Sequence, residues 1–181
     1  MAFNISNFRG QLEFGGARSS LFEVQIFNPI NGVANPKTPF MARAAAIPAA
    51  SVGTVVVPYF GRQLKLAGNR TFAEWTVTVI NDEDFLVRNA LEEWNNQINT
   101  LQGNVRATGD TASSYKSTAT VTQFSKSGDP IRTYEFDGIW CSDVSPIDLN
   151  WDSEGVQEFA VTFQYDYWRV SGGTTGNAGG V

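Results

Sequence analysis

Apolar and polar residues alternate with a period of two along much of this chain, and that period is typical of strands with one solvated face. In residues 71–80, for example, Trp75, Val77 and Val79 fall on one side, whereas Glu74 and the threonines fall on the other. Glycine- and proline-containing turns separate such segments. The segments that we expect to be strands are residues 21–27, 40–47, 71–80, 116–124, 131–141 and 156–168.

Two of these segments place aromatic side chains on one face: Tyr134, Phe136 and Trp140 in the first, and Phe159, Val161, Phe163, Tyr165 and Tyr167 in the second. The second segment, read as one strand, would span roughly 40 Å at ~3.4 Å per residue. Residues 157–167 contain neither lysine nor proline, which usually protect an exposed sheet edge. This strand therefore lies either inside its own sheet or in a barrel shared with neighbouring copies.

Residues 55–66 have the pattern of a β-hairpin with a turn at residues 58–61. Pro58 is expected to set the first turn dihedral, and Gly61 can supply a positive one. The hairpin is too apolar for a free projecting loop. Its apolar side chains either contact another subunit or pack against their own domain: Val55, Val57, Tyr59, Phe60, Leu64 and Leu66.

Residues 82–101 predict one main helix of about four to five turns. Asn81 is expected to cap it, and the acids of residues 82–84 lie where the helix dipole favours negative charge. Apolar residues at helical spacing face inward, namely Val87, Ala90, Leu91, Trp94 and Ile98. Glu83, Glu92 and Glu93 are left toward solvent, which predicts an acidic outer side.

Length and charge narrow the classes of protein that fit. A chain of 181 residues is long enough for one domain that buries roughly 70% of its unfolded surface. We expect this domain over residues 1–171 and a flexible, glycine-rich tail over 172–181. A formal net charge of -5 disfavours general affinity for nucleic acids. The sequence shows no cleaved signal and no apolar run of the ~18 residues that a membrane span requires.

No arrangement of residues predicts catalysis, a cofactor or a metal site. The chain has no histidine, and its single cysteine, Cys141, lies in an expected strand, where we expect it to be core. Helix capping explains the acids of residues 82–84. Asp148, Asp152 and Glu154 could suggest a glycosidase carboxylate pair, but their setting is that of a solvated loop. We therefore expect a protein that is not an enzyme.

The polar faces of the expected strands carry acids and threonines but no lysine or arginine. Their acids are Glu74, Glu135, Asp137, Glu158 and Asp166. Such a surface is either an ordinary solvated sheet face or the wall of a channel that gives passing phosphates no counter-charge. The residue pattern alone leaves both interpretations open.

Several runs of the sequence are shared with one family. They are NISNF at 4–8, GGAR at 15–18, LFEVQI at 21–26 and IPAASVGTVVVPYFGRQLKLAGNRTFAEWTVTVINDEDF at 47–85, together with the aromatic last strand. Through these runs the chain resembles the tail tube proteins of contractile-tailed bacteriophages over nearly its whole length.

The resemblance implies a mainly β fold, an antiparallel β-sandwich or partial barrel with one main α-helix packed on the outside. It implies a structural subunit that forms stacked hexameric rings around a lumen for DNA, inside a contractile sheath. The expected partners are further copies of itself, the sheath, baseplate and tail terminator proteins, the tape-measure protein, and then genomic DNA without sequence-specific binding. The expected location is the virion tail, after assembly in the host cytoplasm.

Three sets of residues acquire expected roles from this resemblance. The ring-stacking set is Val55, Val57, Tyr59, Phe60, Arg62, Leu64 and Lys65. The lumen-facing set is drawn from Glu74, Glu135, Asp137, Glu158 and Asp166, and the sheath-facing set is Glu83, Glu92 and Glu93. Two alternatives remain: the tube subunit of a contractile bacteriocin or secretion system, and a monomeric β-sandwich binding module that holds sugar or peptide.

Overall fold

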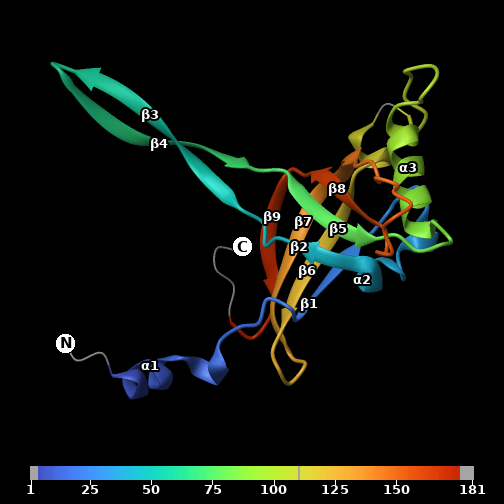
Figure 1. The fold of residues 1–181 in the computed structure, drawn as a ribbon. Coiled ribbons are helices and arrows are strands. Elements are labelled where there is room, and N and C mark those ends of the chain that lie inside the picture. The colour runs from blue at the N-terminus through green and yellow to red at the C-terminus, as the bar shows by residue number, and fades with distance from the viewer. Residues whose placement is uncertain (1–3, 110, 176–181) are drawn as a thin grey trace.

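The described part of the chain, residues 4–109 and 111–175 of a computed structural model, consists mainly of antiparallel strands (Figure 1). Its α-helices and strands are α1 (Ile5–Gln11), β1 (Phe22–Ile26), α2 (Thr38–Met41), β2 (Ala42–Ala45), β3 (Ala50–Tyr59), β4 (Arg62–Phe72), β5 (Trp75–Ile80), α3 (Leu86–Ile98), β6 (Ser117–Phe124), β7 (Pro130–Val144), β8 (Glu158–Gln164) and β9 (Tyr167–Gly172). Three short 3-10 helices, η1 (Glu13–Gly15), η2 (Gly32–Ala34) and η3 (Ala112–Ser114), lie in the connections.

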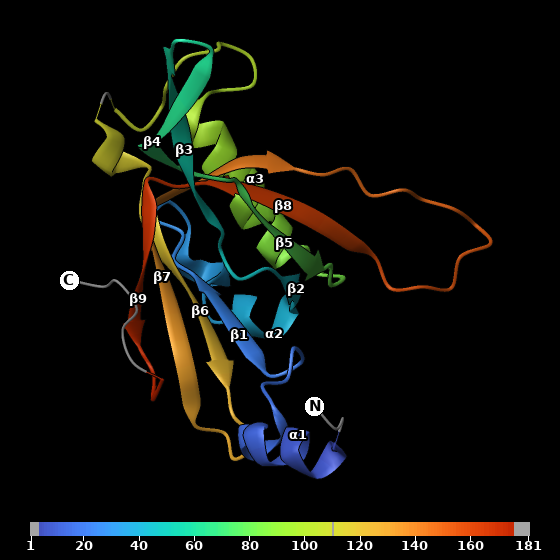
Figure 2. The ribbon, with the colours of Figure 1, turned by 90° about the vertical axis from the view of Figure 1, so that its left-hand side faces the viewer.

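A seven-stranded sheet forms the body, with β1-β6-β7-β8-β5-β2 in order and β9 paired to β7 beside this path. The long strand β7 holds the sheet together, because β6 pairs with one edge while β9 and then β8 pair with the other. Figure 2 shows β5 and β8 running across β1, β6, β7 and β9, so the sheet bends strongly. The bend stacks Trp75 of β5 on Phe136 of β7, with ring centroids 4.3 Å apart. The mainly β, antiparallel fold that we expected is confirmed.

The core lies between the apolar face of the bent sheet and the inner side of α3 (Figure 1). Trp94 of α3 is fully buried, and its indole N–H donates to the Tyr115 carbonyl at 2.9 Å. Burial raises the pKa of the Cys141 thiol to about 12, which confirms a core cysteine with little thiolate character. The inward face predicted for the helix is confirmed, with Val87, Ala90, Leu91 and Trp94 buried and Ile98 packed at the core's edge.

The ends of the main helix differ from the prediction. α3 begins at Leu86 and ends at Ile98, and Asn81 does not cap it. Asn81 instead pairs with Gln157, its N–H donating to the Gln157 carbonyl at 2.9 Å and its side-chain amide to Oε1 at 3.0 Å. Asp84 accepts the Leu86 N–H at 3.0 Å and so satisfies the helix start from two residues upstream.

The predicted single strand over residues 156–168 is wrong, because the chain turns a corner at Tyr165 and Asp166 between β8 and β9. β8 lies between β7 and β5 and is therefore internal to its own sheet. Tyr167 consequently leaves the apolar face, and its hydroxyl donates to the Asp137 carboxylate at 2.7 Å. That carboxylate raises the pKa of the Tyr167 phenol.

Two further expectations for strands need correction. In β7, Gly138 adopts a φ of 68° and shifts the alternation by one residue, so Ile139 and Cys141 are buried while Trp140 is only half-buried. Residues 40–47 are not one strand, because α2 takes their first two residues and β2 begins only at Ala42. Periodicity alone could not separate these short apolar elements.

The C-terminal end of β9 continues into the glycine-rich tail. The N–H groups of Thr174 and Thr175 donate to the carbonyls of Pro130 and Ile131 at 3.3 Å each. Residues 176–181, the rest of the tail that we predicted to be flexible, lie outside the described residues.

Candidate assembly surfaces

Strands β3 and β4 form a two-stranded ribbon, residues 50–72, that projects from the body and that we call the arm (Figure 1). Among the strands that the structure describes, these two pair only with each other. Residues along the arm are exposed, apart from Gly68 and Phe72, which are half-exposed. The hairpin prediction is confirmed, and packing of the hairpin against its own domain is ruled out.

One face of the arm is apolar. The antiparallel register places Val55 opposite Leu66, Val57 opposite Leu64 and Tyr59 opposite Arg62, and paired residues share a face. The exposed fraction of these apolar side chains runs from 41% at Val57 to 71% at Tyr59. An isolated two-stranded ribbon is marginally stable in water, and a continuous apolar surface marks an interaction site. We therefore expect the apolar face of the arm to be covered by a partner in the assembled state.

The tip of the arm is a two-residue turn with a strained aromatic residue. Phe60 and Gly61 have φ angles of 40° and 78°, the signs of a type I′ turn. Pro58 lies in the strand opposite Gln63, so our placement of this proline in the turn is wrong. A phenylalanine disfavours positive φ, yet here its side chain is 91% exposed and packs edge to face on the Tyr59 ring, with ring centroids 4.7 Å apart. Strain of this kind is typical of positions kept for contact.

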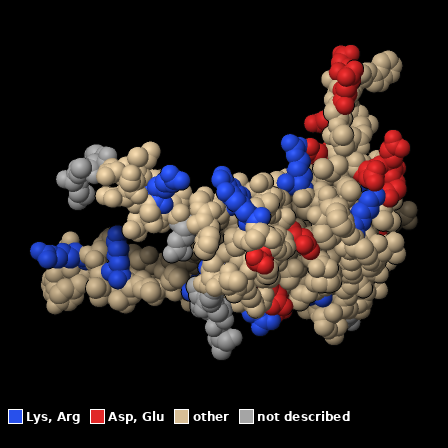
Figure 3. Space-filling model, turned by 90° about the horizontal axis from the view of Figure 1, so that it is seen from below, with Lys and Arg blue, Asp and Glu red and all other residues tan. Residues whose placement is uncertain are grey.

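The arm is also basic. Residues 50–72 contain Arg62, Lys65 and Arg70 and no acid. None of these three forms an ion pair with any residue that the structure describes. In Figure 3 the two projections at the left carry basic side chains and no acidic ones, whereas the projection at the upper right carries acidic ones, and both kinds occur over the body. The molecule thus carries a charge asymmetry along its length.

The five acids of the proposed lumen set lie on or beside the polar side of the sheet, away from the core. Three form ion pairs with bases of the same chain: Glu135 with Arg169 at 3.1 Å, Asp166 with Lys116 at 2.6 Å, and Glu158 with Arg43. The other two have neutral partners, since Asp137 accepts from Tyr167 and Glu74 accepts from Gln164 at 3.2 Å.

These pairs correct our description of the polar strand faces as lacking basic residues. Arg169 lies on β9 directly beside Glu135, and Lys116 and Arg43 reach the sheet surface from its margins. The adjacent Glu135 carboxylate raises the pKa of Arg169. The surface is therefore closer to neutral than the acids alone suggested, and whether it faces a lumen stays a prediction.

The three acids of the proposed sheath set are exposed, as predicted. Glu92 pairs with Arg88 one turn earlier on α3 at 2.7 Å, and Glu93 accepts from the Asn31 amide at 2.7 Å. Glu83, in the turn before α3, makes no side-chain hydrogen bond with the described residues. That these acids face a sheath stays a prediction.

Two exposed apolar surfaces were not predicted from the sequence. Ile5, Phe8 and Leu12 lie at helical spacing on or just after α1 and are exposed, which the i, i+3, i+7 pattern could have revealed. Residues 146–156, between β7 and β8, form a long loop that leaves the body (Figure 2). Its Trp151 is fully exposed.

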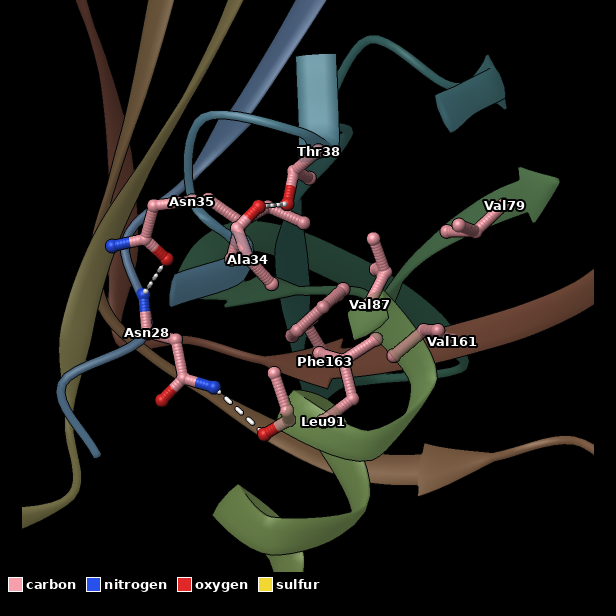
Figure 4. Close-up of a pocket in the computed structure, with 11 residues that line it drawn as sticks. Asn28, Ala34, Asn35, Thr38, Val79, Val87, Leu91, Val161 and Phe163 are labelled. Atoms are coloured by element: carbon pink, nitrogen blue, oxygen red, sulfur yellow. Dashed lines mark hydrogen bonds between the residues drawn. The ribbon is translucent and has the colours of Figure 1, made fainter. Parts of the chain in front are cut away.

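The interior offers no room for a ligand at the junction of α3 with the sheet (Figure 4). A cavity of about 10 Å³ there is lined mainly by apolar side chains, with Asn28 donating to the Ala90 carbonyl at 2.8 Å and Thr38 to the Ala34 carbonyl at 3.0 Å. That volume suits at most one water molecule. Among the described residues, no cluster of three potential metal ligands occurs, and no helix is long and apolar enough to span a membrane.

Comparison with known proteins places these surfaces in context. A family model described as phage tail tube protein matches residues 17–171. The tail tube protein gp19 of Enterobacteria phage T4 is 36% identical over 155 residues, which cover 84% of this chain and 91% of that protein. The tail tube protein of Serratia phage KSP90 is 24% identical over 168 residues, covering 89% and 93% of the two chains.

Solved structures share the fold at low identity. A chain of the extended sheath-tube complex of an extracellular contractile injection system, PVC, matches with a TM-score of 0.60 at 12% identity, covering 94% of this chain and 99% of that one. A chain of the anti-feeding prophage baseplate matches with a TM-score of 0.63 at 15% identity, covering 87% and 97%.

Proposed function

Because the chain belongs to the phage tail tube protein family, whose members are structural and not enzymes, we propose that it builds the tube of a contractile phage tail. In this role it forms hexameric rings that stack around a central lumen, and a contractile sheath surrounds the stack. The observation that carries the proposal is the arm. Its apolar face and strained aromatic tip are exposed in a single chain and call for a neighbouring copy.

Assembly follows from the placement of the arm on one side of the body. A projecting element that binds a different surface on the next copy makes a head-to-tail contact, and such contacts produce closed rings or continuing stacks. Tyr59 and Phe60 are the anchors of this contact, because aromatic residues dominate the binding energy of interfaces. Arg62 and Lys65 flank them and supply the charged rim.

The polar side of the sheet is the surface that suits a lumen. Its acids are held by ion pairs and hydrogen bonds within the chain, among them Glu135 with Arg169 and Asp166 with Lys116. A wall of paired charges attracts a passing duplex weakly, so DNA does not adhere to it. The tape-measure protein occupies this bore first, and genomic DNA passes through it at ejection.

The outer surface then meets the other tail proteins. Glu83, Glu92 and Glu93 face the sheath, and the ends of the stack meet the baseplate and the tail terminator. Assembly takes place in the host cytoplasm, and the tube stays rigid while the contracting sheath drives it through a cell envelope.

Two other functions receive less support. A contractile bacteriocin or secretion tube would share this fold, but identity is 36% to the phage protein gp19 and 12–15% to the injection-system chains. A monomeric binding module for sugar or peptide requires a groove for its ligand. The cavity beneath α3 is too small to serve, and a hollow of about 400 Å³ beside Asn99, Asn104 and Arg106 is lined, among the described residues, by no aromatic side chain that could hold a sugar or peptide.

Electron microscopy and sedimentation of the purified protein test the proposal. We expect rings or tubes with a central bore, in equilibrium with smaller species, when concentration is raised. A protein that stays at its monomer mass of 19.8 kDa over a hundredfold range of concentration, alone and with sheath protein present, would overturn the proposal.

A further inference from the structure

The loop of residues 146–156, which we call the acidic loop, combines carboxylates that are unpaired in the described part of the chain with exposed apolar side chains. It contains Asp148, Asp152 and Glu154 and no base. Within the described residues none of these carboxylates forms an ion pair or a side-chain hydrogen bond. Three large apolar residues stand out from the same loop, with exposed fractions of 78% at Leu149, 104% at Trp151 and 72% at Val156.

The acidic loop is shaped locally and anchored at its base. The Asn150 side chain accepts the Asp152 N–H at 3.1 Å, and the Asn150 carbonyl accepts the Ser153 N–H at 3.2 Å, which makes a turn with Trp151 at its crest. On the β7 side, the Ser145 hydroxyl accepts the Ala160 N–H at 2.8 Å. The Trp151 ring is thus presented from a defined turn, although none of the residues that the structure describes covers it.

The arm and the acidic loop complement each other. The arm carries three bases and no acid, and the loop carries three acids and no base. Both combine their charge with exposed apolar residues, including the aromatic side chains Tyr59 and Phe60 on the arm and Trp151 on the loop. The two elements leave the body in different directions (Figure 2), so they do not meet within one chain.

We propose that the acidic loop of one copy is the surface that receives the arm of a second copy. This inference rests on the proposed tube function and adds the receiving surface to it. Trp151 packs against the apolar face of the arm and against the Arg62 guanidinium, since arginine favours the face of an indole ring. The carboxylates of the loop pair with Arg62, Lys65 and Arg70 at the rim of that contact.

Charge complementarity favours the acidic loop over other acidic surfaces of the chain as the surface that receives the arm. Three acids on or beside the sheet, Glu135, Glu158 and Asp166, are already in ion pairs, and Lys37 binds both Asp82 and Asp84. The acidic loop combines unpaired carboxylates with a fully exposed tryptophan, and tryptophan, tyrosine and arginine are the residues that most often carry interface energy. A contact of arm with loop is heterologous and therefore propagates from copy to copy.

Charge reversal on each side tests the pairing. The arm variant carries Arg62→Glu, Lys65→Glu and Arg70→Glu, and the loop variant carries Asp148→Lys, Asp152→Lys and Glu154→Lys. Each alone should raise the concentration needed for polymerisation by about tenfold or more, because like charges then meet at the contact. The chain with both sets should recover to within about threefold of wild type. A matched control, Glu83→Lys with Glu92→Lys and Glu93→Lys, changes net charge equally to the loop variant and should polymerise as wild type does.

Cysteine cross-linking gives the geometry directly. A chain with Arg62→Cys and Asp152→Cys should form a ladder of disulfide-linked oligomers on oxidation. Cys141 does not compete, because it is buried and its pKa is raised to about 12. The control pair, Arg62→Cys with Asp129→Cys in the exposed β6–β7 turn, should give no ladder.

The outcomes separate this inference from the function on which it rests. If wild-type protein forms no rings or tubes, the proposed function fails. If wild type forms tubes and the loop variant does so at the same concentration, with no ladder, then the function stands and the receiving surface lies elsewhere. A loop variant that forms normal bare tubes but binds sheath poorly assigns the acidic loop to the sheath and also overturns the inference.

Discussion

Gly138 of β7 lies so close to Asp166 that any side chain on the glycine would overlap the Asp166 carboxylate. Gly138 has a φ of 68°, and the neighbouring Asp137 carbonyl accepts the Asp166 N–H at 3.0 Å. The contact marks the point where β7 exchanges β9 for β8 as its partner. Gly138 therefore lies at the bend in a backbone conformation that strains any residue with a side chain.

Replacing Gly138 by alanine should destabilise the protein by about 2 kcal/mol or more, because alanine is strained at positive φ and its methyl group displaces Asp166 from Lys116. Thermal unfolding should show a fall of roughly 5 °C in Tm. Gly172→Ala on β9 is the matched control, since no atom lies near a Cβ there. Equal Tm values for the two variants would contradict this explanation of the bend.

The corner at Tyr165 and Asp166 is a feature that the residue pattern does not predict. The alternation from Phe159 to Tyr167 continues through the corner without a break, so a single strand was the natural interpretation. The cause of the break lies 28 residues away at Gly138, and a glycine inside a strand pattern signals only that a bulge is possible. Strands such as β1, β5 and β6 were predictable because each follows one uninterrupted period of two over its length.

The candidate interfaces also differ in how far the sequence predicts them. The arm was predictable, because a local run of apolar residues around a turn determines it. The partners of the sheet acids were not, because Glu135 meets Arg169 at a separation of 34 residues and Asp166 meets Lys116 at 50. Such pairs depend on register between strands, which the residue pattern of any one strand does not contain.

Low pH should remove the stabilisation that comes from the ion pairs of Lys37 with Asp82 and Asp84. Lys37 binds Asp82 and Asp84 at 2.7 and 2.5 Å and, as the main cause, lowers the pKa of each carboxyl group. A carboxyl group whose pKa is lower in the folded state than in the unfolded state stabilises the fold at pH values above its unfolded pKa. This stabilisation is lost as the pH falls through the folded pKa values. Wild type should therefore be more stable than Lys37→Met at pH 7, and the difference should vanish toward pH 2 in urea unfolding. A difference that is constant with pH would show that Lys37 acts through packing alone.

The aromatic tip of the arm should be required for polymerisation but not for folding. Tyr59→Ser with Phe60→Ser removes the exposed rings, and the body does not contact them, so the circular dichroism spectrum and Tm should be nearly unchanged. Tube growth in sedimentation and micrographs should stop. Leu101→Ser with Val105→Ser, which removes exposed apolar side chains outside the arm, should leave growth intact. Tubes of normal length from the arm variant would show that this tip is not a stacking contact.

Basic residues on the sheet surface should slow DNA if that surface lines the bore. Glu74 and Asp137 are the suitable positions, because their partners Gln164 and Tyr167 are neutral and no ion pair is broken. Glu74→Lys with Asp137→Lys should slow genome ejection roughly threefold or more, and added salt should reduce the delay because phosphate contacts are screened. The neutral pair Glu74→Gln with Asp137→Asn controls for the lost hydrogen bonds. Ejection at the wild-type rate in low salt would place this surface away from the DNA.

The acids around α3 should matter for the sheath and not for the bare tube. A sheath that holds the tube and then releases it is better served by exposed, screened charge pairs than by a large apolar contact. Glu83, Glu92 and Glu93 are exposed, and within the described part of the chain only Glu92 has a basic partner, Arg88. Changing all three to lysine should leave bare tubes intact and weaken sheath assembly around them at low salt, with a smaller defect at high salt. The triple glutamine variant, which removes charge without reversing it, should show an intermediate defect. Normal sheathing of the lysine variant at both salt concentrations would leave these acids with solubility as their role.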